Sequence, residues 1–155
     1  MLSKSLLQFL ASISSFFKTL FFGDFCENNQ EEIKLKDVCA VEFLHLLEAI
    51  YLSVDLEADN EGVIRNKLEC LLRLADRYQV DIVMKRCEMY LKKCPVDEVA
   101  LEDKVIYAQD YRLTELLDQC IKAFETVDDV KKLRQTSQYS RLTLKNKVLI
   151  LENVT

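Results

Sequence analysis

The chain has 155 residues, of which half are hydrophobic and 30% are charged, a balance typical of a globular protein and not of a disordered one. This length allows one compact domain or two small subdomains. The net charge of −5 and the pI near 5.0 exclude a broad positive field, so we expect no nucleic-acid partner, although they leave room for a local basic face. With only two glycines and one proline, the chain is expected to be mostly helical, since sheet-rich folds need many turns.

The N-terminal region predicts an amphipathic helix over about residues 6–22. Its apolar residues recur at steps of four and three and share one face: they are Leu6, Leu10, Ile13, Phe17 and Leu20. The same stretch resembles a secretory signal, but it is too short and too polar to span a membrane, so no membrane partner is expected. Gly23 is expected to end the helix in a left-handed conformation.

A polar loop and one short strand are predicted to follow this helix. Residues 32–36 (EIKLK) alternate between polar and apolar, as a half-buried strand does. Asp37 then marks a turn into a helix over 40–51, spaced by Val41, Leu44, Leu47 and Tyr51. Residues 52–62 form an acidic connection to the next helix.

The rest of the chain is expected to be helical, over about 64–78, 81–93, 97–110 and 113–125. Asp81 is a fair N-cap for the second of these helices, and Pro95 marks a boundary after it. Thr126 is expected to cap a further short helix, with Asp128 and Asp129 in its first turn. In the tail, Leu144, Val148 and Leu151 fit a helix, which we favour over a hairpin around residues 145–147.

An internal repeat links two of the helix pairs. The segments 75–91 and 108–124 both follow the pattern A-x-x-Y-x-φ-x-x-φ-φ-x-x-C-x-x-x-φ, where φ is apolar. Each copy ends one helix, turns and starts another, so we expect the two turns to be alike and Cys87 and Cys120 to occupy equivalent interior positions. The alternative is that any two helical hairpins share such spacing.

Chemistry-bearing residues form no recognisable site. The six cysteines include no CxxC pair, and several lie on apolar helix faces, so we expect buried free thiols and a reducing, intracellular compartment. His45 has no second histidine to complete a metal site, and no phosphate loop or nucleophile motif is present. The sequence therefore predicts a binding protein without catalytic residues, metal or cofactor.

Several blocks, in order and spacing over about 85 residues, resemble a BTB (POZ) domain. They are residues 9–17 (FLASISSFF), 32–38 (EIKLKDV), 42–43 (EF) with 50–51 (IY), 71–79 (LLRLADRYQ) and 85–88 (KRCE). Residues 20–25 (LFFGDF) and 123–139 (AFETVDDVKKLRQTSQY) are most similar to adaptors that join a MATH domain to a BTB domain. The resemblance implies an α+β, predominantly helical fold: a BTB/POZ-like domain over 1–94 with one short strand, followed by a C-terminal helical extension over 95–155.

The family resemblance also implies a function and a contact site. Many members self-associate, and many link a partner to a cullin scaffold for ubiquitin transfer, in the cytoplasm or the nucleus. Cullin-binding members often carry an apolar-x-Glu motif in the loop after the helix equivalent to residues 6–22, and Phe25-Cys26-Glu27 matches it in type and place. The expected function is thus a protein adaptor of a ubiquitin ligase; the alternative is a structural oligomerisation module or scaffold without that link.

The resemblance begins near Leu6, whereas the family fold begins with an extra helix and two strands. We therefore expect the BTB-like domain to be N-terminally incomplete. Family members usually dimerise through these elements, so family-like dimerisation is not assumed for this chain. Either the chain is incomplete, or its tail or another chain supplies the strand that pairs with residues 32–36.

Overall fold

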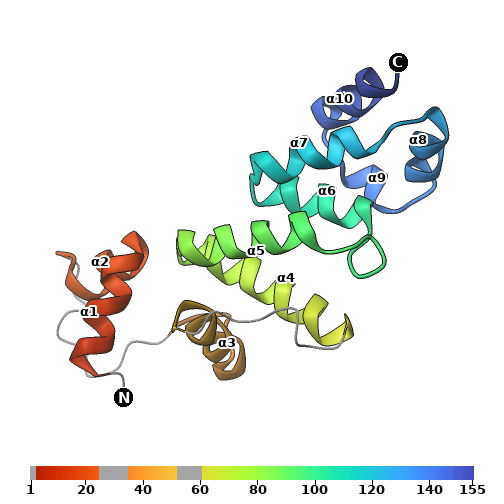
Figure 1. Ribbon diagram of the computed structural model, residues 1–155. Helices are drawn as coiled ribbons and strands as arrows, with labels where there is room; N and C mark the ends of the chain where they lie inside the picture. Colours follow the sequence, from red (N-terminus) through yellow and green to blue (C-terminus); the bar gives the residue numbers. More distant parts are fainter. Residues whose placement is uncertain (1–2, 25–34, 52–60) are drawn as a thin grey trace. The chain divides into compact units, whose positions relative to one another are not determined.

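A computed structural model of the chain describes residues 3–24, 35–51 and 61–155, the last range with side chains from residue 66 onward. These residues form ten α-helices, which confirms the predominantly helical fold (Figure 1). By its internal contacts the chain divides into two compact units, Met1–Cys87 and Glu88–Thr155.

The predicted strand over 32–36 is not found at residues 35 and 36, the part of it that the structure describes. Leu35 has no regular structure, and Lys36 and Asp37 form a turn, while residues 32–34 lie outside the described ranges. Asp37 has a left-handed backbone with φ of 58°, and its place in the turn confirms the turn predicted at this residue. No strand occurs among the described residues.

The described residues of the first unit form four helices and the start of a fifth. They are α1 (Lys4–Ile13), α2 (Ser15–Phe22), α3 (Ala40–Tyr51), α4 (Glu61–Arg77) and α5 (Asp81–Lys93). Helix α1 packs against α2, and α3 packs against α4. Side chains that are fully buried here include Leu10, Phe17, Leu46, Leu68 and Leu72.

The predicted single helix over 6–22 is in fact two helices, α1 and α2, separated by Ser14. This residue has φ of −141° and ψ of 121°, and its hydroxyl accepts a hydrogen bond from Phe17 N at 3.1 Å. Ser14 is therefore the N-cap of α2, a position that serine favours because its side chain satisfies a free N–H of the first turn. The same buried hydroxyl donates to the carbonyl of Tyr78.

Helix α2 ends at Gly23 as predicted, but for a different reason. Gly23 has φ of −75° and ψ of 169°, which is ordinary extended backbone and not left-handed. A Cβ atom at this position would lie only 2.3 Å from the carbonyl oxygen of Thr19. Glycine is thus required by the close approach of its own backbone to the last turn of α2.

Helix α3 has the predicted bounds, but the spacing of Val41, Leu44 and Tyr51 does not mark its buried face. These three side chains are exposed. The buried side chains are instead those of the opposite face, Leu46, Ala49 and Ile50. Because this helix is apolar on more than one side, the sequence period locates the helix without fixing which side faces the core.

The turns from α4 to α5 and from α6 (Leu101–Asp110) to α7 (Thr114–Ala123) are alike, as the internal repeat predicts. Their matched residues have left-handed backbones: φ is 53° at Gln79 and 57° at Arg112. The closing bonds also match, with N–H groups donating to the carbonyls five residues earlier: Val80 to Ala75 and Leu113 to Ala108, both at 2.9 Å. This pattern is a Schellman motif.

The two repeat cysteines are buried, Cys87 with 1% and Cys120 with 2% of the side chain exposed, so their predicted interior placement is confirmed. The prediction that Asp81 caps α5 is wrong by one position, since the helix begins at Asp81 itself. Its carboxylate lies in the first turn, where the helix dipole favours a negative charge. Residues 96–98 form a turn, so α6 starts later than the predicted residue 97.

The second unit holds the end of α5, helices α6 and α7, and three further helices. The latter are α8 (Val127–Arg134), α9 (Gln138–Arg141) and α10 (Leu144–Val154). Thr126 caps α8 in a reciprocal capping box with Asp129, which confirms the predicted cap. The tail is helical, and the hairpin alternative is wrong.

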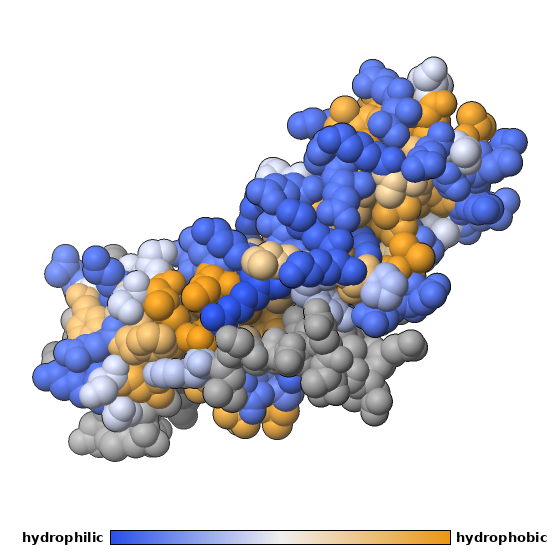
Figure 2. All heavy atoms as spheres, viewed as in Figure 1, coloured by the Kyte–Doolittle hydropathy of each residue, from blue (hydrophilic) through white to orange (hydrophobic). Residues whose placement is uncertain are grey.

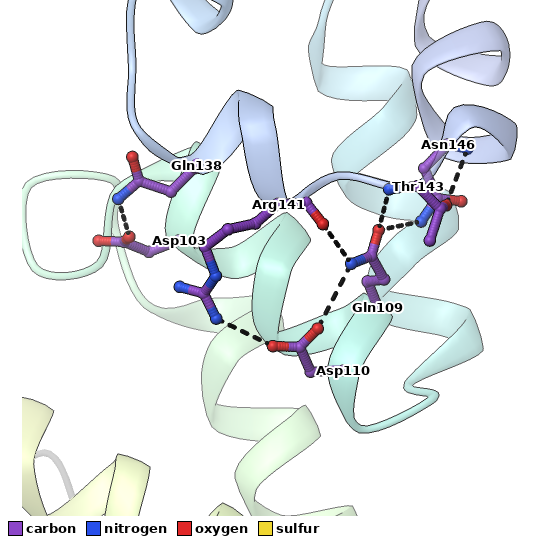
Figure 3. A network of polar contacts seen from close by, with 7 residues as sticks. All are labelled: Asp103, Gln109, Asp110, Gln138, Arg141, Thr143 and Asn146. Carbon is purple, nitrogen blue, oxygen red and sulfur yellow. Dashed lines mark hydrogen bonds and ion pairs between the residues drawn. The ribbon is translucent and has the colours of Figure 1, made fainter.

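The side-chain amide of Gln109 on α6 bonds to both α9 and α10 (Figure 3). Its Oε1 accepts hydrogen bonds from Thr143 N at 2.8 Å and from Asn146 Nδ2 at 3.0 Å. Its Nε2 donates to the carbonyl of Arg141 at 3.0 Å. A single amide therefore satisfies the end of α9 and the start of α10, and the ion pair from Arg141 to Asp110 at 3.1 Å lies beside it.

Replacing Ser14 with alanine is expected to destabilise the protein by about 1–3 kcal/mol, because Phe17 N–H and the Tyr78 carbonyl each lose a partner inside the fold. Urea unfolding followed by circular dichroism measures the change. Ser12→Ala is the matched control, since the Ser12 hydroxyl bonds only to the carbonyl of Phe9 at an exposed position. Equal stability of the two variants would contradict the role given to Ser14.

Replacing Gln109 with alanine is expected to lower the free energy of unfolding by about 1–3 kcal/mol, because the buried Asn146 amide and the Thr143 N–H lose their acceptor. Thermal unfolding of the variant tests this expectation. Gln135→Ala, at an exposed position after α8, should shift the unfolding temperature little. A Gln109 variant that unfolds like the Gln135 variant would show that the network contributes no stability.

Candidate functional site

The predicted contact residues Phe25, Cys26 and Glu27 lie outside the described residues. The structure does describe the two points between which their segment runs. The segment leaves α2 at Gly23, whose N–H donates to the Thr19 carbonyl at 2.9 Å. The chain is described again from Leu35, which is half-buried. Both points belong to the first unit.

The chain just after this segment, around Asp37, is joined to α4 by ion pairs. Asp37 pairs with Arg77 at 3.6 Å, and Glu42 of α3 pairs with Arg73 at 2.6 Å. The bond from Arg73 lowers the pKa of Glu42 below its usual value. Glu42 also accepts from Cys39 N at 3.4 Å while Cys39 Sγ accepts from Glu42 N, so cysteine takes the place of serine in a capping box.

The chain just before this segment, helix α2, packs against a cluster of aromatic rings around Tyr78. Its ring stacks on Phe17 with centroids 5.1 Å apart, and it also contacts Phe16 and Phe43 at 5.2 Å and 6.3 Å. Such pairs favour offset and edge-on geometries and add to the burial of their area. Helix α2, which precedes the predicted contact residues, is thereby fixed to α3 and α4.

The Tyr78 hydroxyl is buried and has no hydrogen-bond partner among the described residues. Burial raises the pKa of Tyr78 above its usual value. A buried hydroxyl without a partner costs stability, and the contacts of the Tyr78 ring described above are packing contacts.

A surface hollow of about 770 Å³ lies beside the same turn. Its lining combines α1, α2 and the start of α5: it includes Gln8, Ser12, Ser15, Lys18, Gln79 and Asp81. The hydroxyl of Ser15 bonds to the Gln79 side chain, so its polar groups are partly engaged with each other. The hollow holds no paired nucleophile and base, and we assign it no chemistry.

A stripe of exposed apolar side chains on α3 was missed by the sequence reasoning, which took the same spacing only as a sign of a helix. It consists of Val41, Leu44 and Tyr51, and Phe9 of α1 stacks on Tyr51 with ring centroids 4.7 Å apart. Figure 2 shows hydrophobic residues open to the surface within the first unit. An exposed apolar stripe of this kind is typical of a protein-binding surface.

The described thiols are mostly buried and unreactive in character. Burial raises the pKa of both Cys87 and Cys120 to about 12, so neither thiol ionises near neutral pH. In the described ranges no three His, Cys, Asp or Glu side chains gather where a metal ion could be held. Nor is any helix in these ranges long and apolar enough to cross a membrane.

These features together define a helical module with exposed apolar surface and without an arranged catalytic group among its described residues. Comparison with known families gives its class: the model of the BTB/POZ domain matches residues 7–95. The chain therefore belongs to the BTB/POZ domain family. Membership of this family indicates that the chain is a protein-interaction module.

Curated relatives from Caenorhabditis elegans agree with this placement. The BTB and MATH domain-containing protein 38 is 31% identical over 94% of this chain and 36% of its own length. The BTB and MATH domain-containing protein 36 is 35% identical over 87% of this chain and 40% of its own length. The chain thus spans well under half the length of these relatives.

Replacing Tyr78 with phenylalanine is expected to leave stability unchanged or to raise it by up to about 2 kcal/mol, because it removes a buried hydroxyl that has no partner in the described part of the chain. The raised pKa adds a pH dependence: the wild type should lose stability as the pH rises above the ordinary tyrosine pKa of 10.0, and the variant should lack this component. Urea unfolding at neutral and at high pH measures both effects.

Tyr90→Phe is the matched control, since the Tyr90 hydroxyl bonds to Glu98 Oε2 at 2.9 Å and its loss should cost about 1 kcal/mol. A Tyr78 variant that is destabilised as much as the Tyr90 variant would show that the Tyr78 hydroxyl does have a partner in solution.

Proposed function

We propose that this protein is a non-enzymatic adaptor that links a protein partner to a cullin-type ubiquitin ligase. The observation that carries the proposal is the BTB/POZ match over residues 7–95, together with the apolar-x-Glu motif Phe25-Cys26-Glu27 directly after α2. Relatives that combine BTB and MATH domains support the adaptor part of the proposal.

The residue types of the motif suit a docking contact. An aromatic side chain such as Phe25 fills an apolar pocket of a partner, and aromatic anchors of this kind carry much of the energy of an interface. The carboxylate of Glu27 orients the encounter through charge complementarity. Helix α2, held by Ser14 and the Tyr78 ring cluster, supplies a fixed point just before the motif.

We propose a separate role for each of the two predicted domains. Residues 1–94 act as the BTB/POZ-like part that contacts the cullin, and residues 95–155 act as a helical extension. Ubiquitin-ligase adaptors work inside the cell, so the proposed location is the cytoplasm or the nucleus. Free buried thiols such as Cys87 and Cys120 support this part of the proposal.

A structural scaffold without a ligase link is the alternative function. The observation that favours it is the exposed apolar stripe of Val41, Leu44 and Tyr51 on α3. An exposed apolar stripe on a small protein is suited to self-association. Native mass spectrometry that detects a self-assembled species, together with no capture of a cullin, would favour this alternative.

The variants Phe25→Ala and Glu27→Lys are each expected to weaken binding to the N-terminal domain of a cullin about tenfold or more. Phe25→Ala removes the apolar anchor, and Glu27→Lys reverses the charge at position 27. Pull-down and calorimetry with the purified chain measure the loss. Circular dichroism should show unchanged helical content, since the motif lies outside the described helices.

Glu31→Lys provides the control, because it makes the same charge change in the same segment outside the motif. It should bind like the wild type. Capture of the cullin by both motif variants at wild-type strength would remove the proposed ligase role.

A further inference from the structure

Helix α10 is docked with polar groups inward and an apolar stripe outward. On its inner side Asn146 is buried and bonded to Gln109, and Asn153 Nδ2 donates to the Phe124 carbonyl at 2.9 Å. Ile150 is the buried apolar residue of the helix. The amide bonds of Figure 3 therefore fix the rotation of α10 about its axis.

The outward side carries Leu144, Val148 and Leu151, whose side chains are 78%, 41% and 44% exposed. Their steps of four and three place them on one face of the helix. Burying a leucine or valine side chain is favourable, and this fold leaves all three of them partly or largely exposed to water. Such a face is stabilised when a partner covers it.

The helices around this stripe carry more cations than anions. From the start of α8 to the end of the chain (residues 127–155) there are six Lys and Arg residues and three Asp and Glu residues, Asp128, Asp129 and Glu152. This local basic region stands out in a chain whose net charge is −5. In the second unit, Figure 2 shows hydrophobic residues edged by hydrophilic ones.

Two of these cations are held together by one ring. The guanidinium of Arg134 lies 5.9 Å and the ammonium of Lys147 lies 4.5 Å from the ring centre of Tyr139, which α9 places between α8 and α10. Each contact is a cation–π interaction. No carboxylate of the described residues forms an ion pair with either cation, in contrast to Lys131 and Arg141, which pair with Asp128 and Asp110.

Charge decides which partner fits this face. A second copy would bring the same cations against one another, which is unfavourable. Nucleic acid would leave the apolar stripe uncovered, and an anionic membrane is usually held by a cluster of about four to eight cations, whereas the ring of Tyr139 gathers two. An apolar stripe bordered by carboxylates satisfies both features of the surface at once.

We propose that the outer face of α10, with Arg134 and Lys147, is a docking surface for an acidic amphipathic helix of a partner protein. The apolar side of that helix covers Leu144, Val148 and Leu151, and its carboxylates meet the two cations on Tyr139. This binding mode lays one amphipathic helix on another. This surface uses no residue of the proposed cullin contact.

The test uses the whole 155-residue chain and a fluorescent peptide of about 14 residues made of leucine and glutamate in amphipathic spacing. Fluorescence anisotropy should show saturable binding that weakens as salt is raised. The double variants Arg134→Glu/Lys147→Glu and Leu144→Ser/Leu151→Ser should each raise Kd about tenfold or more. The matched charge change Lys93→Glu/Lys122→Glu should alter Kd less than about threefold, and thermal melting confirms that each variant is folded.

Several outcomes would overturn the proposal. They include no saturable binding by the folded wild type, unchanged Kd in either test variant, or equal binding of a peptide of the same composition with scattered leucines. Tighter capture of phosphatidylserine vesicles or of oligothymidine through the same residues would identify a membrane or nucleic acid instead. A concentration-dependent dimer that Leu144→Ser/Leu151→Ser abolishes would identify a second copy.

Discussion

The hydrogen bond from the Ser14 hydroxyl to the Tyr78 carbonyl is the contact on which the first unit depends. A carbonyl in the last turn of a helix and an N–H in the first turn both lack partners within their own helices. One buried hydroxyl serves both, because it accepts from Phe17 N while it donates to Tyr78. The break between α1 and α2 and the stacking of Phe17 on Tyr78 follow from this placement.

The backbone turn that contains Tyr78 occurs twice in the chain, and the two copies have different side-chain contacts. Left-handed Gln79 and Arg112 close the two turns with equivalent hydrogen bonds. In the first unit the turn receives Ser14. In the second unit it starts α7, whose N-cap residue Leu113 offers no side-chain acceptor, and Glu88 of α5 supplies one by accepting from Leu116 N at 3.1 Å. The repeat therefore conserves backbone geometry, while different side chains stabilise the helix ends around it.

Features that depend on neighbouring residues could be predicted from the sequence, and features that depend on distant ones could not. The cap at Thr126 and the bounds of α3 follow from local patterns, and both are found. The break at Ser14 was missed because its partner is 64 residues away. The strand over 32–36 was predicted from alternation alone, and it is not found at its described residues, because Leu35 has no regular structure and the turn begins at Lys36. The predicted contact residues Phe25, Cys26 and Glu27 stay a prediction.

The apolar spacing of α3 and α10 located both helices but did not show which way they face. In α10 the polar residue Asn146 is buried because Gln109 offers it a hydrogen bond, and this bond turns Leu144, Val148 and Leu151 outward. A hydrophobic period thus has two meanings, a core contact or a partner contact, and tertiary hydrogen bonds decide between them. In a module that works by binding, an apolar stripe held outward by buried amides is better explained by recognition than by imperfect packing, because the same bonds that expose it also keep it rigid for a partner.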